Sequence, residues 1–310
     1  MKQMANKDLL IQMDEPFAPA AKQDQKVRAN YRYSVWNDIK REFQANKIAC
    51  VCVVLLAIIM IASLLAPLSP YDPDKISISE KFQGISSEHW FGTDDYGRDY
   101  FTRALYGGRV SLMVGFGAMA VTTVLGTTLG IFSGYVGGKV DALIMRLTDI
   151  FLALPSMLLM VVLNAFLKPS LPTLILVLSL FAWPSIARIT RAETMSLKER
   201  DFMVASKKLG AGNLRLAIHH IIPNILGPVV VSSSMNVANA ILMESSLSFM
   251  GLGVRIPQAS WGSMLESAQS QILSMPRLMI LPGVLILITV LSFNLIGDVL
   301  RSALEPKIKK

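Results

Sequence analysis

The chain has 310 residues, of which 52% are hydrophobic and only 17% are charged, and it carries a formal net charge of +8. Together with a mean hydropathy of +0.47, this composition excludes an ordinary soluble domain and indicates that lipid surrounds most of the chain. The basic excess does not indicate a nucleic-acid-binding protein, because Lys and Arg fall in the gaps between apolar runs rather than in one patch. Cys50 and Cys52 lie on one apolar run and predict no disulfide.

The N-terminal segment is polar and charged. Residues 1–30 show no periodicity and are predicted to form a disordered cytoplasmic tail. In residues 31–47, Trp36, Ile39 and Phe43 recur at helical spacing among basic residues, which predicts an amphipathic helix lying in the cytoplasmic interface of the membrane. An ordinary charged flank of an anchor helix is the alternative.

Six apolar runs are long enough to cross a bilayer, which takes about 20 residues. The sequence therefore predicts an all-α membrane protein with six transmembrane helices, of which the last five form one core over residues 110–300. Proline and glycine within the runs predict kinked helices packed through small residues, with Gly126 and Gly130 spaced for close contact. The runs are 48–66, 110–135, 142–167, 171–187, 221–249 and 278–300.

Orientation follows from the segments between the runs. Most of the 30 Lys and Arg residues lie in the segments that share a side with the N-terminus. Because basic residues are retained on the cytoplasmic side, both termini are predicted to be cytoplasmic, including a tail over 301–310. Residues 67–109 then form an extracytoplasmic loop, and residues 188–222 form a cytoplasmic one.

The cytoplasmic loop has a two-part helical pattern. Residues 188–209 are predicted to be helical and to end at Gly210, and Asn213 can cap a second short helix over 214–222. Two helices joined by a glycine elbow make a rigid protrusion suited to docking on another protein, with Lys207, Lys208 and Arg215 adding electrostatic steering. A positively charged loop that only fixes topology is the alternative.

Polar residues inside the apolar runs are candidates for a translocation pathway. Asn236, Asn239 and Asn294 are candidates for a polar lining, although asparagine also bonds helices together in membranes. Glu244 either lines the pathway or is hydrogen-bonded at a helix junction. Two acidic residues have simpler explanations as i, i+3 ion pairs; the expected pairs are Asp149 with Arg146 and Asp298 with Arg301.

The two long outer loops carry their own candidates. In the first, Asp94, Asp95 and Asp99 with His89 match no known metal-binding spacing, and a cap held by Asp-turns and by pairing of Arg98 or Arg103 is the preferred interpretation. The second loop, 251–277, is long enough to contact an external binding protein, or else to form a simple interfacial cap. Its candidate contact residues are Arg255 and Trp261.

Nucleotide hydrolysis has no candidate site in the sequence. The nearest approach to a phosphate-binding loop, SGYVGGKV at Ser133 to Val140, has Ser where the first glycine is needed and Val140 where a hydroxyl is needed. A membrane hydrolase would need a nucleophile and base, and an ion-coupled secondary transporter would need inverted repeats; neither pattern is present.

Several motifs carry a resemblance to a known family. The cytoplasmic loop resembles the EAA motif of binding-protein-dependent ABC importer permeases, with Val204, Ala205 and Ser206 at the three motif positions, then Gly210 and Pro223. It departs from that motif at Val204 in place of glutamate, at Ser206 in place of alanine and at His220 in place of isoleucine. The segments HWFGTDDYGRDYFTRALYGGRVSLMVG, SGYVGGKVDALIMR, ESSLSFMGLG and SFNLIGDVLRSALEPK resemble the second permease subunit of oligopeptide and dipeptide importers.

This resemblance implies a type I ABC importer transmembrane domain in a prokaryotic plasma membrane. The implied partners are a homologous second permease, two ATPase subunits that bind ATP and Mg²⁺, and an extracytoplasmic substrate-binding protein. The chain itself is then expected to bind no cofactor or metal and to have no catalytic residue. Dipeptides or oligopeptides are the implied substrates; nickel, glutathione and antimicrobial peptides are the alternatives within the family.

Overall fold

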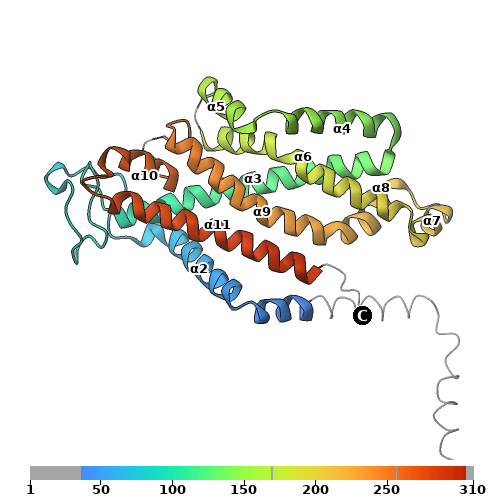
Figure 1. The fold of residues 1–310 in the computed structure, drawn as a ribbon, viewed down its shortest axis with the longest axis horizontal. Helices are drawn as coiled ribbons and strands as arrows, with labels where there is room; N and C mark the ends of the chain where they lie inside the picture. The colour runs from blue at the N-terminus through green and yellow to red at the C-terminus, as the bar shows by residue number, and fades with distance from the viewer. Residues whose placement is uncertain (1–35, 169, 256, 305–310) are drawn as a thin grey trace, which may run out of the picture.

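A computed structural model describes residues 36–168, 170–255 and 257–304. Within these ranges every regular element is a helix, apart from one isolated β-bridge. Figure 1 shows long helices that run alongside one another, with short helices at both ends of the bundle. The predicted tail over residues 1–30 lies outside the described residues.

The first helices cover part of the N-terminal segment that is predicted to be helical. Residues 36–45 are helical, and residues 31–35 of the predicted amphipathic helix lie outside the described part of the chain. The helix ends at Asn46, whose side chain accepts a hydrogen bond from the Ala49 amide and so caps α2 (Lys47–Leu64), the first predicted span.

Helix α3 (Tyr100–Val136) begins ten residues earlier than expected, which corrects the predicted outer loop over 67–109. The side chain of Asp99 accepts a hydrogen bond from the Thr102 amide at 2.7 Å and caps the helix there. At 37 residues, α3 is about 55 Å long and exceeds the hydrocarbon core of a bilayer. Its ends therefore project beyond the lipid.

Helix α6 (Leu171–Lys198) packs closely against α3 through glycine, as the spacing of Gly126 and Gly130 predicts. A Cβ atom at Gly130 would lie 1.8 Å from the Thr190 hydroxyl oxygen, and one at Gly126 would lie 2.8 Å from the Trp183 carbonyl oxygen. No side chain fits at either position, so glycine sets the separation of these two helices.

The third predicted span, over 142–167, is two helices in the structure. Helices α4 (Gly138–Ala153) and α5 (Ser156–Phe166) meet at an angle of 86°. Leu154 adopts an extended conformation because the ring of Pro155 disfavours helical geometry in the residue before it. Five helices of the described residues are long and apolar enough to span a membrane, and the bent pair makes a sixth crossing if counted as one. The predicted six-helix membrane fold is confirmed on that count.

The remaining long helices are α9 (Ile222–Phe249) and α11 (Arg277–Leu304), which pack on each other and on α3. Helix α11 continues four residues into the tail predicted over 301–310, and residues 305–310 lie outside the described part. Figure 1 shows α10 (Trp261–Ala268) at one end of the bundle with the segment that joins α2 to α3; this is called the α10 end.

The opposite end of the bundle, called the α7 end, carries two short helices, α7 (Asp201–Lys208) and α8 (Asn213–Leu216) (Figure 1). The last turn of α11 lies toward the same end. The predicted docking loop therefore lies at the α7 end, and the predicted binding-protein contacts, Arg255 and Trp261, lie at the α10 end.

Candidate functional sites

The segment between α6 and α9 forms an elbow, defined as residues 199–222. Helix α6 ends at Lys198, and Arg200 is extended, so the single helix predicted over 188–209 is interrupted. Gly210 has a φ of +86°, a left-handed conformation that only glycine adopts readily, and it turns the chain from α7 to α8. The predicted glycine elbow is therefore present.

The second arm of the elbow is continuous with α9, which corrects the separate helix predicted over 214–222. After α8, residues Ala217–Ile221 form a π-helical turn that leads directly into α9. Pro223, the predicted entry to the span, lies in the first turn of α9. Proline lacks an amide hydrogen and crowds the carbonyl four residues earlier, and a wider π turn accommodates both.

A small apolar core packs the elbow onto the first turns of α9. Met203 from α7 and Leu216 from α8 are buried against Ile221, Ile225 and Val229. The Tyr135 hydroxyl at the end of α3 also donates a hydrogen bond to the Asn213 side chain at 2.8 Å, and Lys198 donates one to the Tyr135 carbonyl. The two arms are thereby held to each other and to the bundle, as expected of a rigid protrusion.

The outer surface of the elbow is apolar and basic. Leu209 exposes 89% of its surface and Leu214 exposes 74% on either side of Gly210, far from the buried face of the bundle. Exposed apolar side chains that lie close together, unlike single ones, typically mark a contact surface. Neither leucine was among the predicted docking residues, whose exposed side chains are those of Val204, Ala205, Lys207, Lys208, Arg215 and Pro223.

Two of the departures from the EAA pattern contact each other. The Ser206 hydroxyl lies 3.4 Å from Nε2 of His220, and the His220 ring lies 6.0 Å from the ring of Phe202. Ser206 and Phe202 belong to α7, whereas His220 belongs to the π turn. The pair therefore links the two arms of the elbow at the positions where alanine and isoleucine stand in the general motif.

A cavity of about 450 Å³ lies among α3, α5, α6, α9 and α11. Asn236 and Asn239, two of the predicted pathway residues, line it from α9. Asn294 does not line it. The other lining residues are Ala118, Ser156, Met160, Leu178, Phe181, Ala182, Ser185, Ile186, Ile189, Ser232, Met235, Ala240, Met243 and Arg301.

Glu244 is part of a helix junction rather than of this cavity, which corrects its inclusion among the pathway candidates. Its side chain is 0% exposed and accepts hydrogen bonds from Ser248 at 2.7 Å, from Ser111 of α3 at 3.2 Å and from Ser245 at 3.4 Å. Ser111 also accepts a hydrogen bond from the backbone amide of Trp261. Glu244 thus ties α3, α9 and α10 together near the α10 end.

Trp261 was predicted to contact a binding protein, and that prediction is wrong. Its side chain is 1% exposed, and its indole nitrogen donates a hydrogen bond to the Ala104 carbonyl at 3.0 Å. The indole anchors α10 to α3 because a buried tryptophan needs an acceptor for its N–H group. Arg255, the other predicted contact, has an exposed side chain at the same end.

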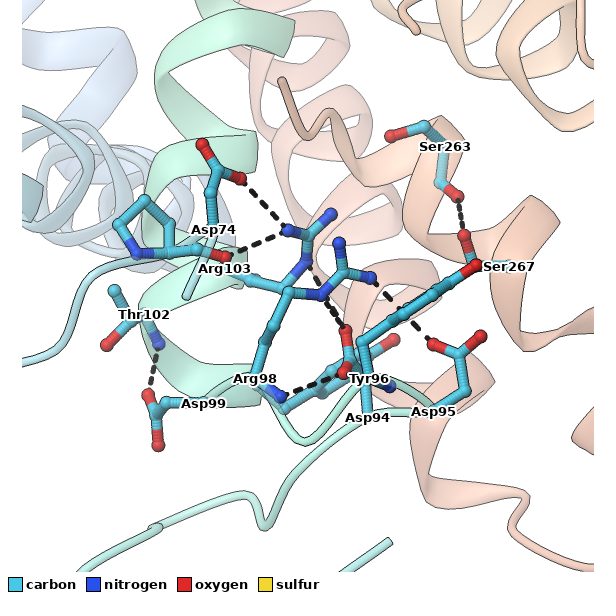
Figure 2. A network of polar contacts seen from close by, with 12 residues as sticks. Asp74, Asp94, Asp95, Tyr96, Arg98, Asp99, Thr102, Arg103, Ser263 and Ser267 are labelled. Atoms are coloured by element: carbon cyan, nitrogen blue, oxygen red, sulfur yellow. Dashed lines mark hydrogen bonds and ion pairs between the residues drawn. The ribbon is translucent and has the colours of Figure 1, made fainter. Parts of the chain in front are cut away.

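The segment before α3 forms a folded cap, as its Asp-turns and arginines predict. Figure 2 shows the guanidinium groups of Arg98 and Arg103 together above the carboxylate of Asp94. Arg98 Nε donates to Asp94 at 2.7 Å, Arg103 Nε lies 3.6 Å from the same carboxylate, and Arg103 also pairs with Asp74 at 3.3 Å. Burial, then the neighbouring Asp94 carboxylate, raises the pKa of Asp95.

The other two residues of this acidic group, His89 and Asp99, bond to each other. His89 Nδ1 lies 2.8 Å from Asp99, whose second oxygen caps α3. The carboxylates and the imidazole therefore hold the cap to the helix.

Helix α4 is attached to α6 by ion pairs near the α7 end. Asp149 pairs with Arg188 of α6, so the expected pair with Arg146 is wrong. Arg191 Nη2 donates to Asp141 at 2.6 Å, and the Ser133 hydroxyl donates to the same carboxylate. The expected pair between Asp298 and Arg301 is also wrong, since no ion pair joins these two described residues.

Comparison with known proteins identifies the family. Residues 126–310 match the description "binding-protein-dependent transport system inner membrane component", and residues 34–84 match the N-terminal transmembrane domain of oligopeptide transport permease C. The chain therefore belongs to the family of inner-membrane permeases of binding-protein-dependent transport systems. Within that family, it is a member of the permease C group of dipeptide and oligopeptide transport systems.

Three relatives illustrate the match. The chain is 42% identical to the dipeptide transport system permease protein DppC of Alkalihalophilus pseudofirmus, covering 89% of this chain and 91% of the relative. It is 37% identical to the oligopeptide transport system permease protein OppC of Bacillus subtilis, covering 96% and 98%. It is 36% identical to the glutathione transport system permease protein GsiD of Pectobacterium atrosepticum, covering 88% and 92%.

A solved structure shares the fold. An inward-facing form of the MetNI methionine ABC transporter matches with a TM-score of 0.52, at 19% identity, over 65% of this chain and 96% of that one. The helical bundle is thus that of a type I ABC importer permease.

Proposed function

We propose that the chain is one of two permease subunits that together form the pathway of an ATP-driven importer of dipeptides or oligopeptides. The relatives named for dipeptide and oligopeptide transport are 37–42% identical over most of the chain and support this substrate class. The relative named for glutathione transport supports a tripeptide as a second candidate. An external binding protein selects among such substrates and delivers them to the α10 end, where Arg255 is exposed.

The elbow couples the chain to two ATPase subunits, which bind ATP and Mg²⁺ and carry out hydrolysis. The observation that carries this proposal is the exposed apolar pair Leu209 and Leu214, flanked by Lys207, Lys208 and Arg215, on a segment whose other face is buried against α9. Apolar anchors of this kind contribute most of the affinity of an interface, and the charges steer the encounter. The matching surface on an ATPase subunit is an apolar groove with an acidic rim.

The α7 end faces the cytoplasm in this proposal, and the membrane is the plasma membrane of a prokaryote. Most of the Lys and Arg residues that the structure describes lie in segments on the α7 side, in agreement with the rule that basic residues stay inside. A rigid elbow transmits closure of the ATPase subunits to α6 and α9 as a rigid-body movement.

Copurification tests the proposal. The full chain, purified from its native membrane in mild detergent, is expected to bring a second permease and ATPase subunits with it, and the sample is expected to hydrolyse ATP. Leu209→Asp should remove the ATPase subunits. Leu273→Asp is the matched control, because Leu273 is 96% exposed but lies outside the elbow, in the segment between α10 and α11. A chain that purifies alone and transports in liposomes without ATP would overturn the proposal.

A further inference from the structure

The cavity among α3, α5, α6, α9 and α11 is separate from the proposed ATPase-docking surface, and its size suits a small molecule. Its volume of about 450 Å³ is in the range of small-molecule sites, which is roughly 300–1,000 Å³. Helices α3, α6 and α9, which line it, also carry the elbow and its attachments. A molecule in this cavity therefore lies where movement of the elbow reaches the bundle.

The walls of the cavity suit a ligand whose side groups vary. Met160, Met235 and Met243 line it from α5 and α9. Methionine is unbranched and polarizable, so it adapts to groups of different shape better than leucine or isoleucine does. The lining also includes three small hydroxyl side chains, those of Ser156, Ser185 and Ser232.

Asn236, which lines the cavity, carries an unpaired hydrogen-bond donor. Its amide nitrogen is buried and has no hydrogen-bond partner among the described residues. Buried donors are normally paired, and an unpaired one is costly, so the group is suited to an acceptor that a ligand brings. Asn239, three residues later on α9, lies on the same helix face. A carboxamide both donates and accepts, which matches the C=O and N–H of a peptide bond.

Arg301 is the one charged residue among the described residues that line the cavity, and no ion pair joins it to a described acidic residue. It lies in the last turn of α11, toward the α7 end. A guanidinium group binds carboxylates in a planar, paired geometry. The cavity thus offers amide partners on α9 and one carboxylate partner at its α7 side.

We propose that this cavity is a transit site for peptides with a free carboxyl terminus. Asn236 and Asn239 hydrogen-bond a backbone amide, Arg301 binds the terminal carboxylate, and the methionine wall accepts the side chains. Recognition then uses only groups that all peptides share, so the site is independent of peptide sequence. This inference rests on the proposed function, since it names how that substrate class is held inside the membrane.

Uptake of a matched pair of peptides tests the role of Arg301. The complete transporter, with its partner subunits, is reconstituted in liposomes and supplied with saturating loaded binding protein, so that uptake reports steps within the membrane. One peptide is an apolar tripeptide and the other is the same tripeptide with a carboxyl-terminal amide. Arg301→Gln is expected to lower the ratio of acid to amide uptake by about threefold to tenfold, as loss of one charged hydrogen bond predicts. An unchanged ratio would overturn the assignment of Arg301.

A second pair of variants tests the asparagine contact. Asn236→Leu keeps the side-chain volume but removes the donor, and it should slow uptake of both peptides at least severalfold. Asn294→Leu is the matched control, because Asn294 lies on α11 and does not line the cavity, and it should leave uptake near the unmodified rate. Equal effects of the two changes would overturn the site.

Two further readouts separate the possible failures. ATP-dependent uptake by the unmodified transporter, with hydrolysis stimulated by the binding protein, verifies the proposed function independently of the cavity. Mass spectrometry of copurified phospholipid tests a lipid phosphate as the partner of Arg301. Loss of a bound phospholipid in Arg301→Gln, with an unchanged ratio of acid to amide uptake, would show a lipid site and overturn the transit site.

Discussion

The two ends of the bundle are held to the long helices by different kinds of interaction. At the α10 end, buried polar side chains hold the structure: Asp94 joins Arg98 and Arg103 in the cap, and Glu244 accepts hydrogen bonds from serine hydroxyls of α3 and α9. At the α7 end, the elbow has a small apolar core and few bonds to the bundle, and it exposes Leu209. The α10 end is thus joined to the bundle by buried polar contacts, whereas the α7 end presents an exposed apolar surface, as the proposed docking on an ATPase subunit requires.

The largest expected effect is at the α10 end. Asp94→Ala leaves Arg98 and Arg103 buried without their shared carboxylate, and loss of one partner of a buried pair costs about 3–5 kcal/mol. The melting temperature of the complex in detergent should fall markedly. Asp95→Asn is the control, because that carboxylate is partly exposed and lies 3.8 Å from Arg98, and it should cost less than about 1 kcal/mol. Equal losses would mean that the charges do not fix the cap.

At the α7 end, a substitution of Gly210 should lower peptide uptake per ATP more than it lowers association with the ATPase subunits. Valine at a φ of +86° costs about 1–3 kcal/mol and distorts the elbow, so uptake of peptide per ATP should fall sharply. Gly212→Val is the matched control, because Gly212 has a φ of −68° and open space around a Cβ. Unchanged uptake and assembly in Gly210→Val would rule out the elbow as a lever.

Reversal of two charges on the elbow should weaken association with the ATPase subunits, with a smaller effect than the substitution of Gly210. Lys207→Glu with Lys208→Glu removes electrostatic attraction worth about 0.2–1 kcal/mol per exposed pair. Association with the ATPase subunits in a pull-down should drop at low salt and approach the unmodified level at high salt, where charges are screened. Lys139→Glu, an exposed lysine of α4, serves as the control. A loss that does not depend on salt would contradict steering.

The smallest expected effect is at the contact between the arms of the elbow. Ser206→Ala and His220→Ile should each destabilise the elbow slightly, and the double change should recover part of the loss, with a coupling energy of roughly 0.5–1 kcal/mol. A double-mutant cycle on uptake per ATP measures this. His219→Ile is the control, since His219 makes no hydrogen bond to α7 among the described residues. Strict additivity would mean that the two departures are independent.

The sequence predicts features that depend on continuous or regularly spaced residues. The apolar runs locate the long helices because burying apolar side chains in lipid requires about 20 of them in succession. The spacing of Gly126 and Gly130 predicts a close helix contact, though not that α6 is the partner, and Gly210 predicts the elbow, because each position requires the absence of a Cβ. Asn236 and Asn239 were also predicted as lining residues on their polarity alone.

Features that depend on tertiary contacts were missed. The break at Glu199 and Arg200 contains neither glycine nor proline, so no local signal marks it. The sequence leaves Glu244 open between a pathway and a helix junction, and it predicts Trp261 at a contact surface. Their serine and carbonyl partners come from distant parts of the chain, which a linear pattern does not bring together. Only Asp99, three residues before Thr102, offered a usable capping signal for the early start of α3.

Site-specific cross-linking in native membranes tests most directly whether the elbow docks on an ATPase. Leu214→Cys, in a chain with Cys50 and Cys52 replaced by alanine, places one exposed thiol on the elbow. Leu273→Cys places one outside the elbow, between α10 and α11. We predict that a short bifunctional reagent cross-links the Leu214→Cys chain, but not the Leu273→Cys chain, to an ATPase subunit. The yield of that cross-link should change when ATP is added. A cross-link to the ATPase from position 273 alone would contradict both the orientation and the docking surface.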